Sequence, residues 1–201
     1  MVFGVCAASQ AALITIDFGG LGGPNENPFT SPYTEEEFSV TPVVGDWFEG
    51  QNAGVNGNPI PAIFADPVIP GGSELQTGAI QVLIPLGGSF SFQSVELRSG
   101  SQPGMDFEIL GFFQGSLRLS QMGTIGLENI FTLITSTDEN AVLDLLTIEL
   151  IPTTDEISSM SLDNIVLNTI TSPPPVPEPS GLALLGLGLA LLARFRRRSN
   201  G

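Results

Sequence analysis

The side chains that could carry out chemistry in this chain are almost all carboxylates. The sequence has 21 Asp and Glu residues, no histidine and a single cysteine, Cys6. Without histidine the chain cannot form a Ser-His-Asp triad, a Cys-His dyad or a histidine-bound zinc site. A pair of carboxylates for glycoside hydrolysis stays open, with Asp106 and Glu108 on one strand face or Asp138-Glu139 in a turn. Solvent exposure explains each pair more simply, so we expect a protein that is not an enzyme.

Sugar binding by ring stacking is the second chemistry that the sequence offers. The sole tryptophan, Trp47, lies in a loop-rich region, and Tyr33 could join it if these loops fold together. An exposed aromatic ring has a large apolar face and, in Trp and Tyr, a polar group that can form a hydrogen bond. We therefore take Trp47 and Tyr33 as candidate carbohydrate-binding residues, with core packing of Trp47 as the alternative.

The charge of the body argues against nucleic acid as a partner. Residues 13–177 contain twenty acidic residues but only Arg98 and Arg118 as basic ones, a net charge of −18. Duplex binding depends on cationic contacts with phosphates, which this composition does not supply. Such a surface suits a soluble protein kept apart by self-repulsion, or one that collects divalent cations.

The elements that must position these residues are short strands. Apolar or alternating runs are broken repeatedly by Gly, Pro, Asn and Ser, and long helical patterns are missing. This pattern predicts one antiparallel β-sandwich domain over residues 13–171. The expected strands are Leu13–Phe18, Phe38–Val44, Ile60–Phe64, Ala79–Ile84, Phe90–Leu97, Asp106–Phe113, Ser116–Leu119, Ile130–Ile134, Leu143–Ile151 and Asn164–Ile170.

Two local features refine this prediction. Phe90 and Phe92 followed by Val95 and Leu97 indicate a strand that changes its inward face across a bulge at Gln93-Ser94. The region 19–57 is rich in Pro, Asn and Glu, and we expect it to form long surface loops.

The C-terminal segment has three physically different parts in order. Pro177-Glu178-Pro179 is stiff and extended, and the run Gly181–Ala193 after it is wholly apolar. Four arginines then close the chain: Arg194, Arg196, Arg197 and Arg198. This order predicts a transmembrane helix over 180–193, stopped by a basic cytoplasmic tail over 194–201. The apolar run rises only ~20 Å as a helix, which is short for a ~30 Å hydrocarbon core and favours a temporary anchor.

This ordered combination resembles the PEP-CTERM sorting signal of exosortase substrates. The resemblance implies that an exosortase-type membrane sorting enzyme recognises Pro177, Glu178 and Pro179, and that the helix is then removed. The Pro-rich linker 172–179 would hold the domain away from the inner membrane until processing. Residues 1–12 are apolar or small and read as a partial signal peptide, with a signal peptidase site after Ala11.

A second resemblance covers the body. Four short motifs in this order resemble jelly-roll, galactose-binding-like domains: Thr15–Phe18, Tyr33–Phe38, Phe90–Leu97 and Ser161–Leu167. The resemblance implies a structural calcium near Asp17 and Asp163, with no other cofactor expected. The alternative is that Asp163 and Asn164 cap a turn before the last strand.

Together these observations predict an exported, non-enzymatic protein of a Gram-negative cell surface or extracellular matrix. It would be anchored transiently in the inner membrane and could bind exopolysaccharide. The alternatives are a carbohydrate-binding module with a specific glycan ligand and a carboxylate-dependent glycoside hydrolase.

Overall fold

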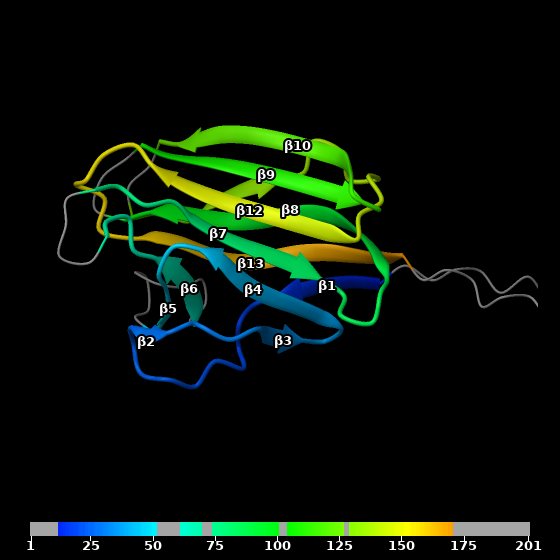
Figure 1. The fold of residues 1–201 in the computed structure, drawn as a ribbon, viewed down its shortest axis with the longest axis horizontal. Helices are drawn as coiled ribbons and strands as arrows, with labels where there is room; N and C mark the ends of the chain where they lie inside the picture. Colours follow the sequence, from blue (N-terminus) through cyan, green and yellow to red (C-terminus); the bar gives the residue numbers. More distant parts are fainter. Residues whose placement is uncertain (1–11, 52–60, 70–73, 101–103, 127–128, 171–201) are drawn as a thin grey trace, which may run out of the picture. The chain divides into compact units, whose positions relative to one another are not determined.

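The computed structural model describes residues 12–51, 61–69, 74–100, 104–126 and 129–170, all within one compact unit, Gln10–Thr171. The described residues form thirteen strands and no helix (Figure 1). The strands are β1 (Ala12–Ile16), β2 (Asn27–Pro28), β3 (Tyr33–Glu35), β4 (Phe38–Val44), β5 (Trp47–Gly50), β6 (Ala62–Ala65), β7 (Gly78–Leu83), β8 (Ser89–Ser99), β9 (Met105–Phe113), β10 (Ser116–Ile125), β11 (Thr132–Thr135), β12 (Leu145–Pro152) and β13 (Met160–Ile170).

These strands form two antiparallel sheets, which confirms the predicted all-β fold class. The first sheet has the order β11-β8-β13-β6-β5-β2, and β1 also pairs with β13. The second has the order β10-β9-β12-β7-β4-β3, and Figure 1 shows its strands side by side in one layer, with β8 and β13 behind them. One edge of β13 is divided, because its first residues pair with β6 and its later residues with β1.

Period-two alternation explains why these segments form strands that pack as two layers. In β12 every second residue is buried, and β9 has the same pattern along most of its length. The apolar side chains that point inward from both sheets form one core, in which the Phe38 and Phe90 rings meet edge to face at 5.3 Å. Burial of these inward faces supplies the main driving force for the fold.

The predicted bulge in β8 is confirmed. Phe90, Phe92, Val95 and Leu97 are all fully buried, although the spacing changes from two residues to three between Phe92 and Val95. The pairing of β8 with β13 shifts register at this position. An extra residue turns the strand so that its apolar side chains still face the core on both sides of the bulge.

The prediction of long loops over residues 19–57 is wrong in part, because β2, β3 and β5 lie in this region. Gly45, at φ 79°, forms the bend after β4 from which the chain crosses to β5 in the first sheet. Glu49 of β5 accepts hydrogen bonds from the Asn27 amide at 2.6 Å and the Gly23 N–H at 3.0 Å. Polar contacts therefore hold the loop between β1 and β2 against the β5–β2 edge of the first sheet.

The predicted signal segment, linker, transmembrane helix and basic tail lie outside the described residues, apart from Ala12 of β1. No helix of sufficient length and apolar character to cross a membrane occurs within the ranges that the structure describes.

Candidate functional site

Tyr33 holds the loop after β1 and is only half exposed. The Gly20 N–H donates to its hydroxyl at 3.0 Å, and the hydroxyl donates to Glu35 Oε2 at 3.1 Å. Its ring packs against Phe18 with the centroids 5.4 Å apart. Burial raises the pKa of Tyr33 to about 12. These contacts occupy the hydroxyl and part of the ring, so they give Tyr33 an anchoring role, while its sugar contact stays a prediction.

Glu35 is the centre of this small polar cluster. Its Oε2 also accepts the Phe18 N–H at 3.1 Å. Burial raises the pKa of the Glu35 carboxyl, and the neighbouring Asp17 carboxylate raises it further. Asp17 itself is exposed and accepts the Gly19 N–H at 2.8 Å. Because two close carboxylates disfavour simultaneous ionisation, Glu35 holds its proton more readily than an isolated carboxyl does.

Asp163, the other predicted calcium residue, lies in a different environment. It is fully buried in β13, and its Oδ1 accepts the Asn164 N–H at 2.8 Å. Asn164 has φ 47° and donates from its side chain to Glu96 Oε2 at 2.9 Å. The alternative of a turn before the last strand is therefore wrong, because both residues lie at an irregularity inside β13.

No group of three or more potential metal ligands comes together among the residues that the structure describes. A calcium ion at Asp17 would thus take most of its six to eight oxygen ligands from backbone carbonyls and water. Calcium at Asp17 and Asp163 remains a prediction.

Arg98 is a buried cation that the sequence analysis did not single out. Its guanidinium donates to Ser161 Oγ at 3.5 Å and to Asn129 Oδ1 at 2.5 Å. Burial lowers the pKa of Arg98, but a guanidinium in a protein stays charged. The contacts join β8 to β13 and to the segment before β11, so Arg98 is a structural residue. The signal in the sequence that could have pointed to Arg98 is its position as an isolated basic residue at the end of a predicted strand in an acidic chain.

The structure excludes Trp47 as a carbohydrate-binding residue. Its side chain is only 2% exposed, and its Nε1 donates to the Val44 carbonyl at 2.9 Å. The residue opens β5 and points into the core, opposite Ala65 of β6. A ring placed there cannot stack on a sugar, so the core-packing alternative is the correct one for Trp47.

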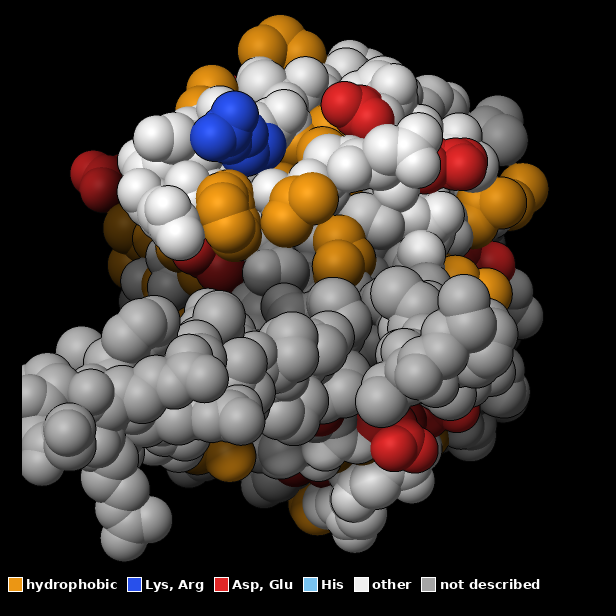
Figure 2. Space-filling view, turned by 90° about the vertical axis from the view of Figure 1, so that its right-hand side faces the viewer, with side chains coloured by type: hydrophobic (Ala, Val, Ile, Leu, Met, Phe, Trp, Pro, Cys, Tyr) orange, Lys and Arg blue, Asp and Glu red, His pale blue; other side chains and the backbone are white. Residues whose placement is uncertain are grey.

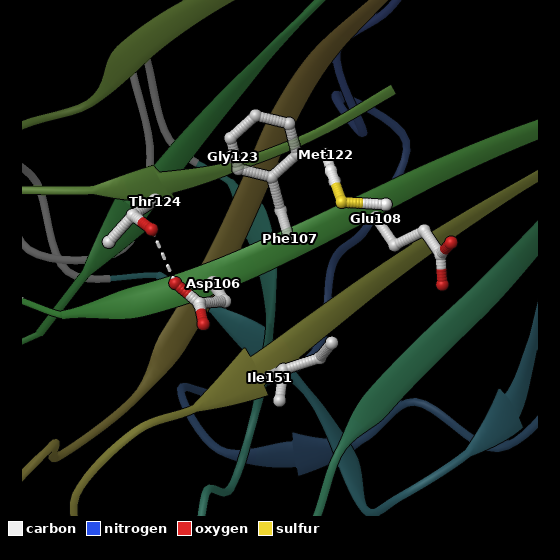
Figure 3. A pocket seen from close by; sticks show the side chains of 7 residues that line it. All are labelled: Asp106, Phe107, Glu108, Met122, Gly123, Thr124 and Ile151. Carbon is white, nitrogen blue, oxygen red and sulfur yellow. Dashed lines mark hydrogen bonds between the residues drawn. The ribbon is translucent and has the colours of Figure 1, made fainter. Parts of the chain in front are cut away.

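A pocket of about 270 Å³ opens beside the outer face of the second sheet (Figure 3). It is lined by Asp106, Phe107, Glu108, Met122, Gly123, Thr124 and Ile151, from β9, β10 and β12. Thr124 donates a hydrogen bond to Asp106 Oδ1 at 2.5 Å. The pocket combines carboxylate acceptors with apolar walls, an arrangement that can receive a hydroxylated ligand.

The carboxylates that were considered for hydrolysis do not converge in this pocket. Figure 3 shows the Glu108 carboxylate pointing away from Asp106. Glu149 of β12 lies directly opposite Glu108 in the register, on the same open face of the sheet. Asp138 and Glu139 are exposed in a turn between β11 and β12, where Asp138 Oδ1 accepts the Asn140 N–H at 3.1 Å.

The fold and these sites define the described part of the chain as an antiparallel β-sandwich with a surface pocket lined by carboxylates and apolar side chains. Residues 175–198 match the PEP-CTERM protein-sorting motif. The protein therefore carries a C-terminal, membrane-associated sorting signal typical of exported proteins, and the motif implies an exosortase-type partner. Pro177, Glu178, Pro179 and the closing arginines belong to this match and lie outside the described residues.

Solved structures with a similar fold include three distant ones. A DUF4465 family protein from Bacteroides caccae has a TM-score of 0.47 and 10% identity, covering 78% of this chain and 98% of its own. The K1 cleaved adhesin domain of Lys-gingipain from Porphyromonas gingivalis has a TM-score of 0.43 and 13% identity, covering 80% and 99%. A family 29 carbohydrate-binding module from Piromyces equi has a TM-score of 0.41 and 13% identity, covering 80% and 91%. No curated protein matches the sequence.

Proposed function

We propose that this protein is a non-enzymatic component of the cell surface or extracellular matrix of a Gram-negative bacterium, delivered by an exosortase-type system. The observation that carries the proposal is the order of parts: β13 ends at Ile170, and the sorting motif begins five residues later, at Pro175. The sorting enzyme would recognise Pro177-Glu178-Pro179 and remove the apolar segment. The folded sandwich would then remain outside the cell.

We further propose that the sandwich contacts exopolysaccharide. An exported sandwich would meet matrix polysaccharide directly, and the sheet-face pocket of Figure 3 offers acceptors and apolar surface for a sugar ring. The net charge of −15 supports a soluble, dispersed matrix component and disfavours binding to nucleic acid.

The absence of catalysis is part of the same proposal. The chain has no histidine, and the carboxylates of Asp106 and Glu108 point apart on an open sheet face. The alternative, a carboxylate-dependent glycoside hydrolase, requires two carboxyl groups on opposite sides of one bond. Incubation with a panel of polysaccharides should release no oligosaccharides; release that disappears in Glu108→Gln would favour the hydrolase.

The sorting proposal is tested by mass spectrometry of the protein recovered from the cell surface. We expect a C-terminus near Pro177–Pro179, without the segment from Gly181 onward. Replacement of Pro177, Glu178 and Pro179 by alanine should leave the uncut chain in the membrane fraction. The matched control replaces Pro173 and Pro174, which precede the motif, and should be processed normally. Surface protein that keeps its arginine tail would contradict the proposal.

A further inference from the structure

A second pocket, of about 610 Å³, lies at the end of the sandwich where β9 turns into β10. It is lined by Phe113, Arg118, Asp138, Ala141 and Val142. Phe113 ends β9, Arg118 lies near the start of β10, and the other three residues belong to the segment between β11 and β12. Its volume is within the ~300–1,000 Å³ typical of small-molecule pockets. Figure 2 faces this end of the molecule and shows one basic patch with hydrophobic side chains around it.

Hydrogen bonds hold the walls of this end pocket. The tight β9–β10 turn has φ 51° at Gln114 and 74° at Gly115, and the Gln114 N–H donates to Asp144 Oδ2 at 2.7 Å. On the other wall, the Ala141 N–H donates to the Asp138 carbonyl at 3.2 Å. The Gln93 side chain donates to the Glu139 carbonyl at 3.0 Å. A ligand would therefore meet walls that are already ordered, which lowers the entropic cost of binding.

The backbone presents Arg118 at an irregular position. Leu117 pairs with Phe112 and Leu119 with Gly111, so Arg118 is the extra residue of a bulge in β10. Bulges commonly redirect a side chain at the edge of a sheet. Arg118 is exposed, and its side chain forms no hydrogen bond or ion pair with another described residue.

The charge of Arg118 is exceptional for this molecule. The described residues contain two basic side chains, and the other one, Arg98, is 1% exposed. Arg118 is thus the one exposed cation of the described surface, in a chain of net charge −15. An anionic ligand would be repelled over most of the surface and attracted at this point.

We infer that the end pocket binds an acidic sugar unit, a uronic acid, of the polysaccharide. A guanidinium binds a carboxylate in a bidentate manner, which would orient the sugar ring. The half-buried Phe113 ring and Val142, 39% exposed, offer an apolar wall to the C–H face of a pyranose. The Asp138 carboxylate can accept a sugar hydroxyl. This inference rests on the proposed binding of exopolysaccharide and adds its chemical class and its site.

The test is calorimetric titration of the full-length protein in detergent solution. The probes are an oligogalacturonate, a neutral malto-oligosaccharide of the same length, and sodium acetate. We expect the oligogalacturonate to bind more tightly than both, and its affinity to fall as salt is added. Arg118→Gln should weaken that binding at least about tenfold, because a charge-assisted hydrogen bond contributes more than a neutral one. Arg118→Lys should bind with intermediate affinity, since it keeps the charge but not the bidentate geometry.

The control variant is Thr34→Glu, which changes the net charge by the same amount as Arg118→Gln. Thr34 is exposed on β3, at the opposite edge of the same sheet. Thr34→Glu should leave the affinity for oligogalacturonate unchanged. Equal losses of affinity in Thr34→Glu and Arg118→Gln would overturn the assigned site. Binding of both oligosaccharides that is insensitive to Arg118→Gln would also overturn it while leaving polysaccharide binding in place. Binding of neither would contradict polysaccharide binding as well, and leave the sorting proposal standing.

Discussion

Replacement of Trp47 by alanine tests the placement of this residue in the core. The side chain is 2% exposed, so its truncation removes nearly all of a buried indole. Its neighbours cannot fill the space, because Gly78 has no side chain and Ala65 has only a methyl group. Gly78 lies against the indole, since a Cβ added there would be 3.1 Å from Trp47 Cζ2. The cavity should therefore persist, which places the loss of folding free energy at about 4–5 kcal/mol, in the upper part of the range for large aromatic residues.

A loss of this size is large for a domain of this length. Each kcal/mol lowers Tm by roughly 2–4 °C for a domain of 150–250 residues, so Trp47→Ala should lower Tm by about 8–20 °C. Trp47→Phe keeps most of the ring volume and loses the hydrogen bond to the carbonyl of Val44, a residue that is 49% exposed. Water can replace that bond, so we expect Trp47→Phe to cost less than about 2 kcal/mol.

The assay is thermal and denaturant unfolding followed by fluorescence. Because Trp47 is the only tryptophan, the emission of the wild-type protein reports on this one site. The native emission should be blue-shifted and should move to longer wavelength on unfolding; circular dichroism follows the alanine variant. Unchanged stability in Trp47→Ala, together with loss of polysaccharide binding, would refute the core placement and restore the sugar-stacking hypothesis.

Three further changes test the cluster around β3 and the packing of β7. The raised pKa of Glu35 means that the folded protein holds this proton more tightly than the unfolded chain, whose carboxyl has a pKa near 4.5. The stability that this proton contributes is present below pH 4.5 and is lost as the pH rises through the raised pKa of Glu35. The part of the decrease in Tm between about pH 4 and pH 7 that comes from Glu35 should therefore be missing in Glu35→Gln. Gly78→Ala should destabilise by about 1–3 kcal/mol in urea unfolding, because the added Cβ would lie 2.4 Å from Ala65 Cβ. A calcium ion bound at Asp17 would make Tm fall in EDTA and rise in CaCl₂, and neither change should occur in Asp17→Asn.

The sequence predicted the strands that alternate strongly and missed those that do not. Phe38–Val44 was predicted with the bounds that β4 has, and the bulge after Phe92 could be derived from the change in apolar spacing. The strand β5 has the sequence WFEG, which contains one charge and one glycine and shows no clear alternation. Its strand conformation depends on pairing with β6, which lies beyond a long connection. Tertiary pairing of this kind leaves no local signal.

Trp47 was a candidate for sugar binding because the strand β5 was missed. A tryptophan in a surface loop can be exposed, whereas the first residue of β5 points inward and fills the space above Gly78. The sequence likewise does not show which of the two arginines of the body is exposed. Arg118 is the extra residue of the bulge in β10 and is exposed, whereas Arg98 pairs with Ser161 of β13 and is buried.

The two kinds of function differ in how far the sequence can reveal them. A sorting signal is read as a linear segment, so composition and order within residues 175–198 are enough to recognise it. A sugar site combines side chains from distant segments, such as Phe113, Arg118 and Asp138 in the end pocket, and their proximity exists only after the β9–β10 turn and the β11–β12 segment have folded. The composition of the body nevertheless limits which residues could bind an anionic sugar. In a body with twenty acidic residues and two arginines, a cationic side chain for an anion can come only from those two, and burial of Arg98 leaves Arg118.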